Sequence, residues 1–356
     1  MIAALAAAAG FARPAAASTL TVAQAFADLN GWRQLAGEPP VLYEDPNLSH
    51  GCQLHNAYLA TNRIGGHDED PTLPGYSQLG AQAGSSSVLV DAEMLPRVGF
   101  ERAVFHRLAL LQPRLQTSWY DANFGNTCMG VFGLNDAVRT PVLTLYPWPF
   151  SNQRRVPVDF ATDEFPSPYD DAPGAQRLGY PLSVQVNGPW SGSDSVTVAD
   201  AQLVSDRSGP TRVVSVDANS VHGDVLSGGF ALLPFSALGY HQWYTASVSG
   251  TVSTAGLEGT TVSVPFVYNW RFETDWPTPR LSITTWSDGR VQARSSSRAP
   301  VKITYSRGAI TVSQWTRPLR RVVARVRGRW AVCLDQRPRG HWAAAHVCYP
   351  AIRVGR

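Results

Sequence analysis

Prolines limit how far any helix or strand of this chain can run. The chain has 356 residues with 26 prolines and 30 glycines, and six of the prolines lie between positions 147 and 173. Proline fixes φ and removes a backbone donor, so neither a helix interior nor a central strand passes easily through such a segment. We therefore expect a linker at residues 146–181, and many short strands joined by turns in the chain as a whole.

The composition argues against disorder, and no apolar run is long enough for a membrane-spanning helix. Hydrophobic residues make up 44% of the chain and charged residues 16%, whereas a disordered chain is poorer in the former and richer in the latter. At about 100–200 residues per domain, the length allows two or three domains. No run of about 18 apolar residues occurs, so the sequence predicts no transmembrane segment in the mature protein.

The first residues have the pattern of an export signal. An apolar run from Ile2 to Ala12 is followed by the small residues Ala15 to Ser18, and that order is typical of a signal peptide. The basic residues that usually precede the apolar run are missing, and the alternative is an alanine-rich helix of the folded domain. We expect residues 1–17 to be a signal peptide and the mature protein to be secreted or extracytoplasmic.

The four cysteines fit an oxidising compartment. Cys52 and Cys128 lie early in the chain, and Cys333 and Cys348 lie late. Four cysteines allow three pairings. Because the early and the late pair fall in different parts of the chain, we expect the disulfides Cys52–Cys128 and Cys333–Cys348. Four buried free thiols are the alternative, and they are less common outside a reducing compartment.

Helical signals are confined to the first part of the chain. Thr21 can cap a helix with apolar residues on one face, and Asp45, followed by proline, has the pattern of a second N-cap. The second helix would turn His55 inward, as a buried and hydrogen-bonded histidine rather than a ligand. We expect a third helix after Pro96, separated from the second by a glycine- and serine-rich stretch.

The later parts of the chain, residues 151–275 and 276–356, are rich in strand signals. In the former, β-branched runs separated by turn residues predict about seven strands, which is typical of a β-sandwich. In the latter, turn residues at 287–289 and 306–308 predict two hairpins. We therefore expect a sandwich followed by a small all-β module.

The charge of the chain is divided between its parts. Residues 277–356 hold 16 basic and two acidic residues, a net charge of +14, while residues 1–276 hold 14 basic and 25 acidic residues, a net charge of −11. Arginine binds carboxylate and phosphate groups well. We expect the basic module to bind an anionic envelope polymer or lipid headgroups, rather than nucleic acid, through a cluster of arginines: Arg320, Arg321, Arg325, Arg327 and Arg329. The alternative is that the module docks on the acidic remainder of its own chain.

A series of short motifs follows in order along about a third of the chain. They are Leu29-Asn30-Gly31-Trp32-Arg33 with Gly37 and Pro39-Pro40, Asp45-Pro46-x-Leu48-Ser49, His55-x-x-Tyr58-Leu59, His67, His106-Arg107 and Leu111-x-Pro113. The series resembles bacterial domains of the CAP superfamily, which includes cysteine-rich secretory, antigen 5 and plant pathogenesis-related proteins.

The resemblance implies that residues 18–150 form an α-β-α sandwich with a central cleft. In many members this cleft holds two histidines and two glutamates, and the histidines can bind a divalent metal. His67 and His106 match the two histidines. The glutamates do not carry over, because the Gly-Glu-Asn motif is absent and the second glutamate position falls near Ala103.

The part that follows is similar to the Ig-like β-sandwich found after such domains in some bacterial proteins. Motifs such as Tyr146-Pro147, Gly179-Tyr180-Pro181 and Trp270-x-Phe272 carry this similarity. The expected fold class is therefore α+β, with an N-terminal CAP-like α-β-α sandwich, an all-β Ig-like sandwich and a small basic all-β module.

The two histidines raise the question of a metal. Imidazole suits zinc, but a structural zinc site needs four ligands and a catalytic site three with a water. Glu69, two residues after His67, is the best third ligand. The alternative, which we favour because the glutamates are missing, is that His67 and His106 are hydrogen-bonded residues of a polar cleft. No cofactor is certain, and zinc in the cleft stays an alternative.

No motif of a common hydrolase or nucleotide-binding enzyme occurs in the sequence. It lacks the Gly-x-Ser-x-Gly elbow, the His-Glu-x-x-His zinc motif, a phosphate loop and a dinucleotide fingerprint. We therefore expect an exported, envelope-associated protein that acts by binding. Two alternatives stay open: a metal-assisted hydrolase that uses His67, His106 and Glu69, and a carrier of a lipid or small molecule.

Overall fold

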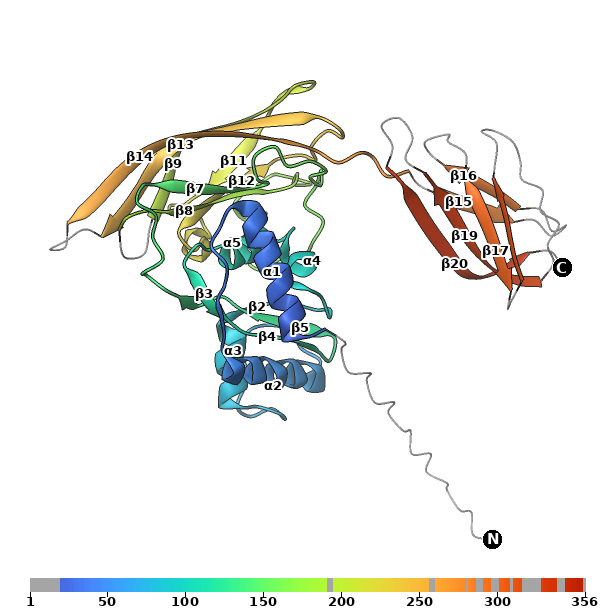
Figure 1. Cartoon of the computed structure of the whole chain (residues 1–356), viewed down its shortest axis with the longest axis horizontal. Coiled ribbons are helices and arrows are strands. Elements are labelled where there is room, and N and C mark those ends of the chain that lie inside the picture. Colours follow the sequence, from blue (N-terminus) through green and yellow to red (C-terminus); the bar gives the residue numbers. More distant parts are fainter. Residues whose placement is uncertain are drawn as a thin grey trace, which may run out of the picture. The chain divides into compact units, whose positions relative to one another are not determined.

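The chain folds into two compact units. The computed structural model describes residues 20–190, 195–255, 260–279, 281–285, 291–295, 301–307, 310–315, 328–337 and 343–354. The first unit takes the described residues of Met1–Gln153, Asp159–Leu238 and Tyr244–Phe272, and the second those of Arg154–Val158, Gly239–Trp243 and Glu273–Arg356. The expected signal peptide, residues 1–17, lies outside the described residues. Within them the fold is mixed α+β and mostly β, with five α-helices and twenty strands in six sheets (Figure 1).

Two helices begin where their capping residues predict. Thr21 forms a capping box with Gln24 at the start of the first helix, and Asp45 accepts hydrogen bonds from the backbone of Asn47 and Leu48 at the start of the second. These side chains satisfy backbone donors that a helix start leaves unpaired. The helices are α1 (Val22–Ala36), α2 (Pro46–Asn62), α3 (Gln78–Ser85), α4 (Pro96–Phe100) and α5 (Val104–Leu110).

The glycine- and serine-rich stretch contains a helix, α3, that the sequence analysis missed. Ser77 caps it by accepting a hydrogen bond from the backbone of Gly80. Its glycines let it approach α2 closely, since a Cβ on Gly51 of α2 would lie 2.7 Å from the carbonyl oxygen of Leu79. The small residues that indicated a loop therefore serve helix packing.

The expected third helix is divided in two. α4 ends at Phe100, α5 starts at Val104, and the residues between them are not helical. The break coincides with a buried carboxylate, because Glu164 binds the backbone at the start of α5. The prediction of one continuous helix was wrong because this partner comes from a distant part of the sequence.

The helices of the first part cover small sheets. α2 contacts β4 and β5, and α3 contacts β2, in a three-stranded antiparallel sheet with the order β2-β5-β4. These strands are β2 (Ser87–Val90), β4 (Tyr120–Asn123) and β5 (Asn126–Gly130). A second sheet, with the order β1-β3-β6, consists of β1 (Tyr43–Glu44), β3 (Leu115–Ser118) and β6 (Gly133–Leu134).

Two four-stranded sheets follow, with the orders β11-β12-β8-β7 and β10-β9-β13-β14, and the former is antiparallel throughout. Both faces of the former are covered. On one face Ala231 and Leu233 join a core cluster with Leu108 of α5, and on the other Phe230 stacks on Phe266 of β14. Every residue of β8 and β12 is accordingly buried. The strands are β7 (Thr144–Trp148), β8 (Leu182–Asn187), β9 (Ser195–Ser205), β10 (Gly209–Thr211), β11 (Val213–Val216), β12 (Gly229–Pro234), β13 (Trp243–Ala255) and β14 (Thr261–Glu273).

The proline-rich segment expected to be a linker is part of the packed structure. Its first residues belong to β7, which pairs with β8. Trp148, Phe160 and Tyr180 are buried, and the indole of Trp148 donates a 2.9 Å hydrogen bond to the Tyr180 hydroxyl. The prolines do keep regular elements short, but the aromatic residues between them fill the core.

The second unit contains the strands of the basic module. β17 pairs with β18 and β15 with β16, so both hairpins are confirmed. β19 and β20 complete a sheet with the order β18-β17-β19-β20, over a core that includes Ile303, Val332 and Leu334. The strands are β15 (Leu281–Thr285), β16 (Val291–Ser295), β17 (Lys302–Arg307), β18 (Ile310–Trp315), β19 (Gly328–Gln336) and β20 (Ala345–Val354). Among the described residues, no helix has the length and hydropathy to span a membrane.

Candidate functional site

Glu69, expected as a ligand beside His67, is the buried partner of His55. One carboxylate oxygen of Glu69 lies 3.0 Å from Nδ1 of His55, and the other accepts a hydrogen bond from the backbone of Ser77. Nε2 of His55 lies 3.1 Å from the carbonyl oxygen of Gly66. Both side chains are fully buried. The interpretation of His55 as a buried, hydrogen-bonded histidine is confirmed, and Glu69 is engaged away from His67.

The surroundings of His67 favour a neutral imidazole. Its Nδ1 lies 3.1 Å from the carbonyl oxygen of Gly84, so Nδ1 carries the proton and donates it. Burial lowers the pKa of His67, the charges of His106 and His55 lower it further, and the hydrogen bond to Gly84 raises it. Nε2 is then a lone-pair acceptor, and no described residue bonds to it.

His106 has an acidic partner, Glu164, that lies far from it in the sequence. Nδ1 of His106 lies 3.2 Å from Oε1 of Glu164. The same carboxylate accepts hydrogen bonds of 2.7 to 3.0 Å from the backbone of Val104, Phe105 and His106. Glu164 therefore both starts α5 and orients the His106 ring. Sequence reasoning missed it because it lies in the segment expected to be a linker.

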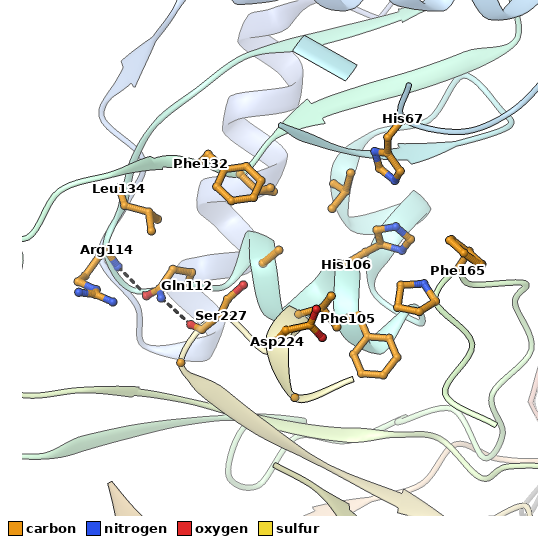
Figure 2. Close-up of a pocket in the computed structure, with 17 residues that line it drawn as sticks. His67, Phe105, His106, Gln112, Arg114, Phe132, Leu134, Phe165, Asp224 and Ser227 are labelled. Atoms are coloured by element: carbon orange, nitrogen blue, oxygen red, sulfur yellow. Dashed lines mark hydrogen bonds between the residues drawn. The ribbon is translucent and has the colours of Figure 1, made fainter. Parts of the chain in front are cut away.

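His67 and His106 line one cavity of about 450 Å³ in the first unit. Figure 2 shows both rings on the same side of it, away from Arg114 and Leu134. Most of the lining is apolar, and the residues Phe132 and Phe165 are exposed (66% and 82%). The apolar lining residues are Val88, Phe105, Ala109, Val131, Phe132, Leu134, Phe165, Pro166 and Val225.

Two of the remaining polar side chains of the cavity, Gln112 and Arg114, are bonded to the protein, whereas Asp224 is exposed. Gln112 donates a 2.6 Å hydrogen bond to the carbonyl oxygen of Ser227 and accepts one from the backbone of Arg114. The guanidinium of Arg114 lies 2.9 Å from Asp136. These bonds fix the wall opposite the histidines.

A second histidine–carboxylate pair holds the neighbouring wall. Asp171 lies 2.7 Å from Nδ1 of His222 and also accepts a hydrogen bond from its backbone. His222 directly precedes the short helix η1 (Gly223–Val225), which lines the cavity together with Ser227. The proline-rich segment thus supplies carboxylates to two walls of the cavity.

The residues around the two histidines do not fit a resident metal ion. Zinc needs at least three protein ligands. Glu69 is bound to His55, and Glu164 is bound to three backbone donors and to His106. Within the described part of the chain, no group of three candidate ligand atoms that includes His67 and His106 lies within 4.8 Å. The set His67, His106 and Glu69 is therefore not brought together.

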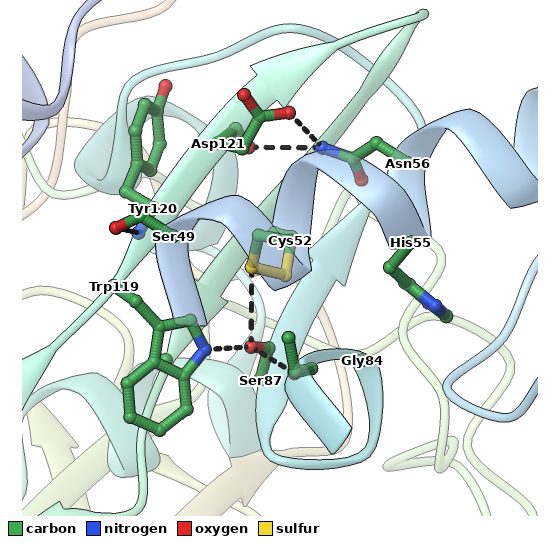
Figure 3. Close-up of a disulfide and its surroundings, with 12 residues drawn as sticks. Ser49, Cys52, His55, Asn56, Gly84, Ser87, Trp119, Tyr120 and Asp121 are labelled. Carbon is green, nitrogen blue, oxygen red and sulfur yellow. Dashed lines mark hydrogen bonds between the residues drawn. A yellow bond between two sulfur atoms is a disulfide. The ribbon is translucent and has the colours of Figure 1, made fainter. Parts of the chain in front are cut away.

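Both expected disulfides are present, Cys52–Cys128 and Cys333–Cys348. The former joins α2 to β5 and is fully buried. Figure 3 shows Ser87 beside it, where the Ser87 hydroxyl accepts a 2.8 Å hydrogen bond from the indole of Trp119.

The expected arginine cluster lies almost wholly outside the described residues. Arg320, Arg321, Arg325 and Arg327 lie outside the described residues, and only the backbone of Arg329 is described, in β19.

Comparisons with known proteins do not assign a family. No family profile matches the chain, and no curated protein sequence does. Among solved structures, one described as "The Bacillus anthracis TIE protein" is similar over 60% of this chain, with 12% sequence identity and a TM-score of 0.18. The aligned region spans 38% of that structure.

Proposed function

We propose that this chain acts by binding, and that its cavity takes a small amphiphile with an apolar body and a hydroxyl head group. The observation that carries the proposal is the cavity of about 450 Å³ with mostly apolar walls and two histidines on one side. Small-molecule sites commonly have volumes of about 300–1,000 Å³ and a few polar groups among apolar ones.

The hydrogen bonds around the histidines favour an uncharged head group. His67 is neutral and can accept a hydrogen bond through Nε2, and a hydroxyl can both donate and accept one. An anionic head group would need a positive partner once it is buried, and the carboxylate of Asp224 in the lining would repel it. Arg114, the cation of the cavity wall, already has Asp136 as its partner.

Calorimetric titration with octan-1-ol and with octanoate tests this proposal. We expect the alcohol to bind and the carboxylate, which has the same chain length, to bind about tenfold or more weakly, because its charge would be buried without a partner. Ala109→Trp fills the cavity and should abolish binding. Ala137→Trp is the matched control, since Ala137 is exposed. Equal binding of octan-1-ol by both variants would contradict the proposal.

The role of His67 is tested by its replacement. His67→Phe keeps a ring of similar shape and removes the acceptor, so we expect a loss of about 1–3 kcal/mol in binding of the alcohol. His50→Phe changes an exposed histidine of α2 and should leave the affinity unchanged. An unchanged affinity in the His67 variant would show that the cavity does not recognise the hydroxyl.

The expected family relationship and export enter as proposals. The ordered motifs, and the shared cavity of His67 and His106, support a divergent CAP-like first part followed by an Ig-like sandwich. The two disulfides support an oxidising, extracytoplasmic location. The charge of +14 in residues 277–356 supports association with an anionic envelope polymer or with lipid headgroups.

A further inference from the structure

The disulfide of the second unit lies on the solvent side of its sheet. Cys333 of β19 and Cys348 of β20 are directly opposite each other. Their neighbours Leu334 and Val347 belong to the core on the other face. Cys348 is exposed and Cys333 is half-buried. This disulfide is therefore accessible, whereas both cysteines of the Cys52–Cys128 disulfide are fully buried.

A histidine and a carboxylate are aligned on the exposed sulfur. His346 lies two residues before Cys348 in β20, so both side chains share one face of the sheet. Nε2 of His346 is 3.0 Å from Sγ of Cys348. Nδ1 of His346 is bonded to Asp335, which is opposite to it in β19. Asp335, His346 and the Cys348 sulfur thus form a continuous series of contacts.

We propose that Cys333–Cys348 is an exchangeable disulfide whose reaction with a small anionic thiol is assisted by His346. The incoming thiolate attacks Sγ of Cys333 and forms a mixed disulfide with it. The bond between the two cysteine sulfurs breaks, its electron pair goes to Sγ of Cys348, and protonated His346 donates the proton from Nε2. The products are the mixed disulfide at Cys333, the thiol of Cys348 and a neutral imidazole.

The geometry determines which sulfur leaves. The better leaving sulfur is the one whose thiolate is stabilised or protonated, and His346 contacts Cys348. Asp335 acts as a positioning residue, because its bond to Nδ1 aims Nε2 at the sulfur. This arrangement has the same three parts as an activated cysteine site: a carboxylate that orients the histidine, a histidine that transfers the proton, and a reactive sulfur.

A cavity whose lining includes His346 and Asp335, the two residues aligned on the Cys348 sulfur, favours one class of thiol. It measures about 580 Å³, and its lining includes Lys302, Trp315, Arg337 and His346. The guanidinium of Arg337 lies 5.4 Å from the centre of the Trp315 ring. Asp335 is the acidic residue of the lining, and it is bonded to His346. The two cations therefore favour a thiol that carries a negative charge.

The test exposes the full oxidised chain, with a chelator present, to 2-mercaptoethanesulfonate, followed by alkylation and peptide mapping. We expect the adduct on Cys333 and the alkyl group on Cys348, while Cys52–Cys128 stays intact. Cysteamine, a cationic thiol of similar size, should react several-fold more slowly at equal thiolate concentration. An adduct on Cys348, or opening of both disulfides at similar rates, would overturn the proposal.

Variants separate assistance by His346 from simple exposure. His346→Gln should slow the exchange by about tenfold or more, since positioned proton donors contribute at least that much, while His50→Gln should not change the rate. Asp335→Ala should also slow it, and Asp335→Asn should restore most of the rate because its amide oxygen can still accept from Nδ1. An unchanged rate in the His346 variant would refute assistance even if the disulfide is reactive.

Discussion

At the scale of single residues, two buried carboxylates differ in how their charge is satisfied. Glu164 accepts three backbone hydrogen bonds and contacts His106. Glu38 is 3.5 Å from the guanidinium of Arg33, but neither of its oxygens forms a hydrogen bond with any residue that the structure describes. Arg33 instead donates to the carbonyl oxygens of Pro39 and Leu110. Burial without hydrogen bonds disfavours the ionised carboxylate.

Glu38 makes stability depend on pH. Burial raises its pKa from 4.5 to about 8, although the Arg33 charge opposes the shift. The folded chain then holds a proton that the unfolded chain has lost, so the stability is full below pH 4.5 and falls as the pH rises toward 8. The slope is at most about 1.4 kcal/mol per pH unit.

Urea unfolding at a series of pH values tests this account. Glu38→Gln should lose this part of the pH dependence of stability, and Glu44→Gln, an exposed control, should keep it. Parallel pH profiles of the Glu38 variant and the parent chain would contradict this account.

Glu164 should matter more for stability than its neighbour in sequence. Glu164→Gln removes a charged acceptor from three backbone donors at the start of α5, and we expect a loss of about 2–3 kcal/mol in the free energy of unfolding. Asp163→Asn changes an exposed carboxylate and should cost less than about 0.5 kcal/mol. Denaturant unfolding measures both losses. Equal losses in the two variants would mean that the hydrogen bonds of Glu164 to the start of α5 do not stabilise the fold.

The candidate site was only partly predictable from single residues. His67 and His106 could be found from their motifs, and helical periodicity was enough to turn His55 inward. The acidic partners could not be assigned in the same way, because hydrogen-bond pairing across the fold decides them. Glu69 is close to His67 in sequence yet pairs with His55, and Glu164 reaches His106 from 58 residues away.

At the scale of elements, the packing of α3 on α2 depends on glycines, which have no side chain at the contact. A Cβ on Gly84 would lie 2.5 Å from Cε1 of His55 (Figure 3 shows both residues). Gly84→Ala should therefore cost about 1–3 kcal/mol in the free energy of unfolding, because the buried His55–Glu69 pair must shift. Gly31→Ala, in α1 with no atom within 4 Å of the new Cβ, should instead be neutral or stabilise by up to about 1 kcal/mol. Thermal unfolding distinguishes the two, and a tolerated Gly84 variant would mean that α3 adjusts freely.

Elements whose signals lie in their own sequence could be predicted. Elements that depend on contacts with distant parts of the chain could not. The caps Thr21 and Asp45 act on backbone groups within their own first turn, so sequence alone identifies them. α3 was missed because its glycines indicate a loop unless the partner helix is known. The segment 146–181 was taken for a linker because prolines forbid long elements, while burial of its aromatic residues is decided by the sheets around it.

At the scale of the whole molecule, the two ends of the chain differ in charge. Residues 277–356 carry +14 and residues 1–276 carry −11. If the basic part binds an anionic polymer, the affinity should fall steeply with salt, because counterions are released on binding.

We expect glutamine replacement of Arg320, Arg321, Arg325, Arg327 and Arg329 together to weaken binding of the full chain to an anionic polymer, and to reduce its salt dependence. Replacing the same number of arginines in residues 1–276 is the control. Equal binding by the two variants would point to docking of the basic part on its own chain.

The central claim is that His67 and His106 form the polar end of a ligand cavity. Nuclear magnetic resonance of histidine side chains tests it most directly, because the chain has only eight histidines. During titration of the full chain with octan-1-ol, the ring signals of His67 and His106 should shift together and saturate, while those of His50 and His241 stay in place. Shifts spread evenly over all histidines, or no shift at His67 and His106 when the alcohol binds, would contradict the account.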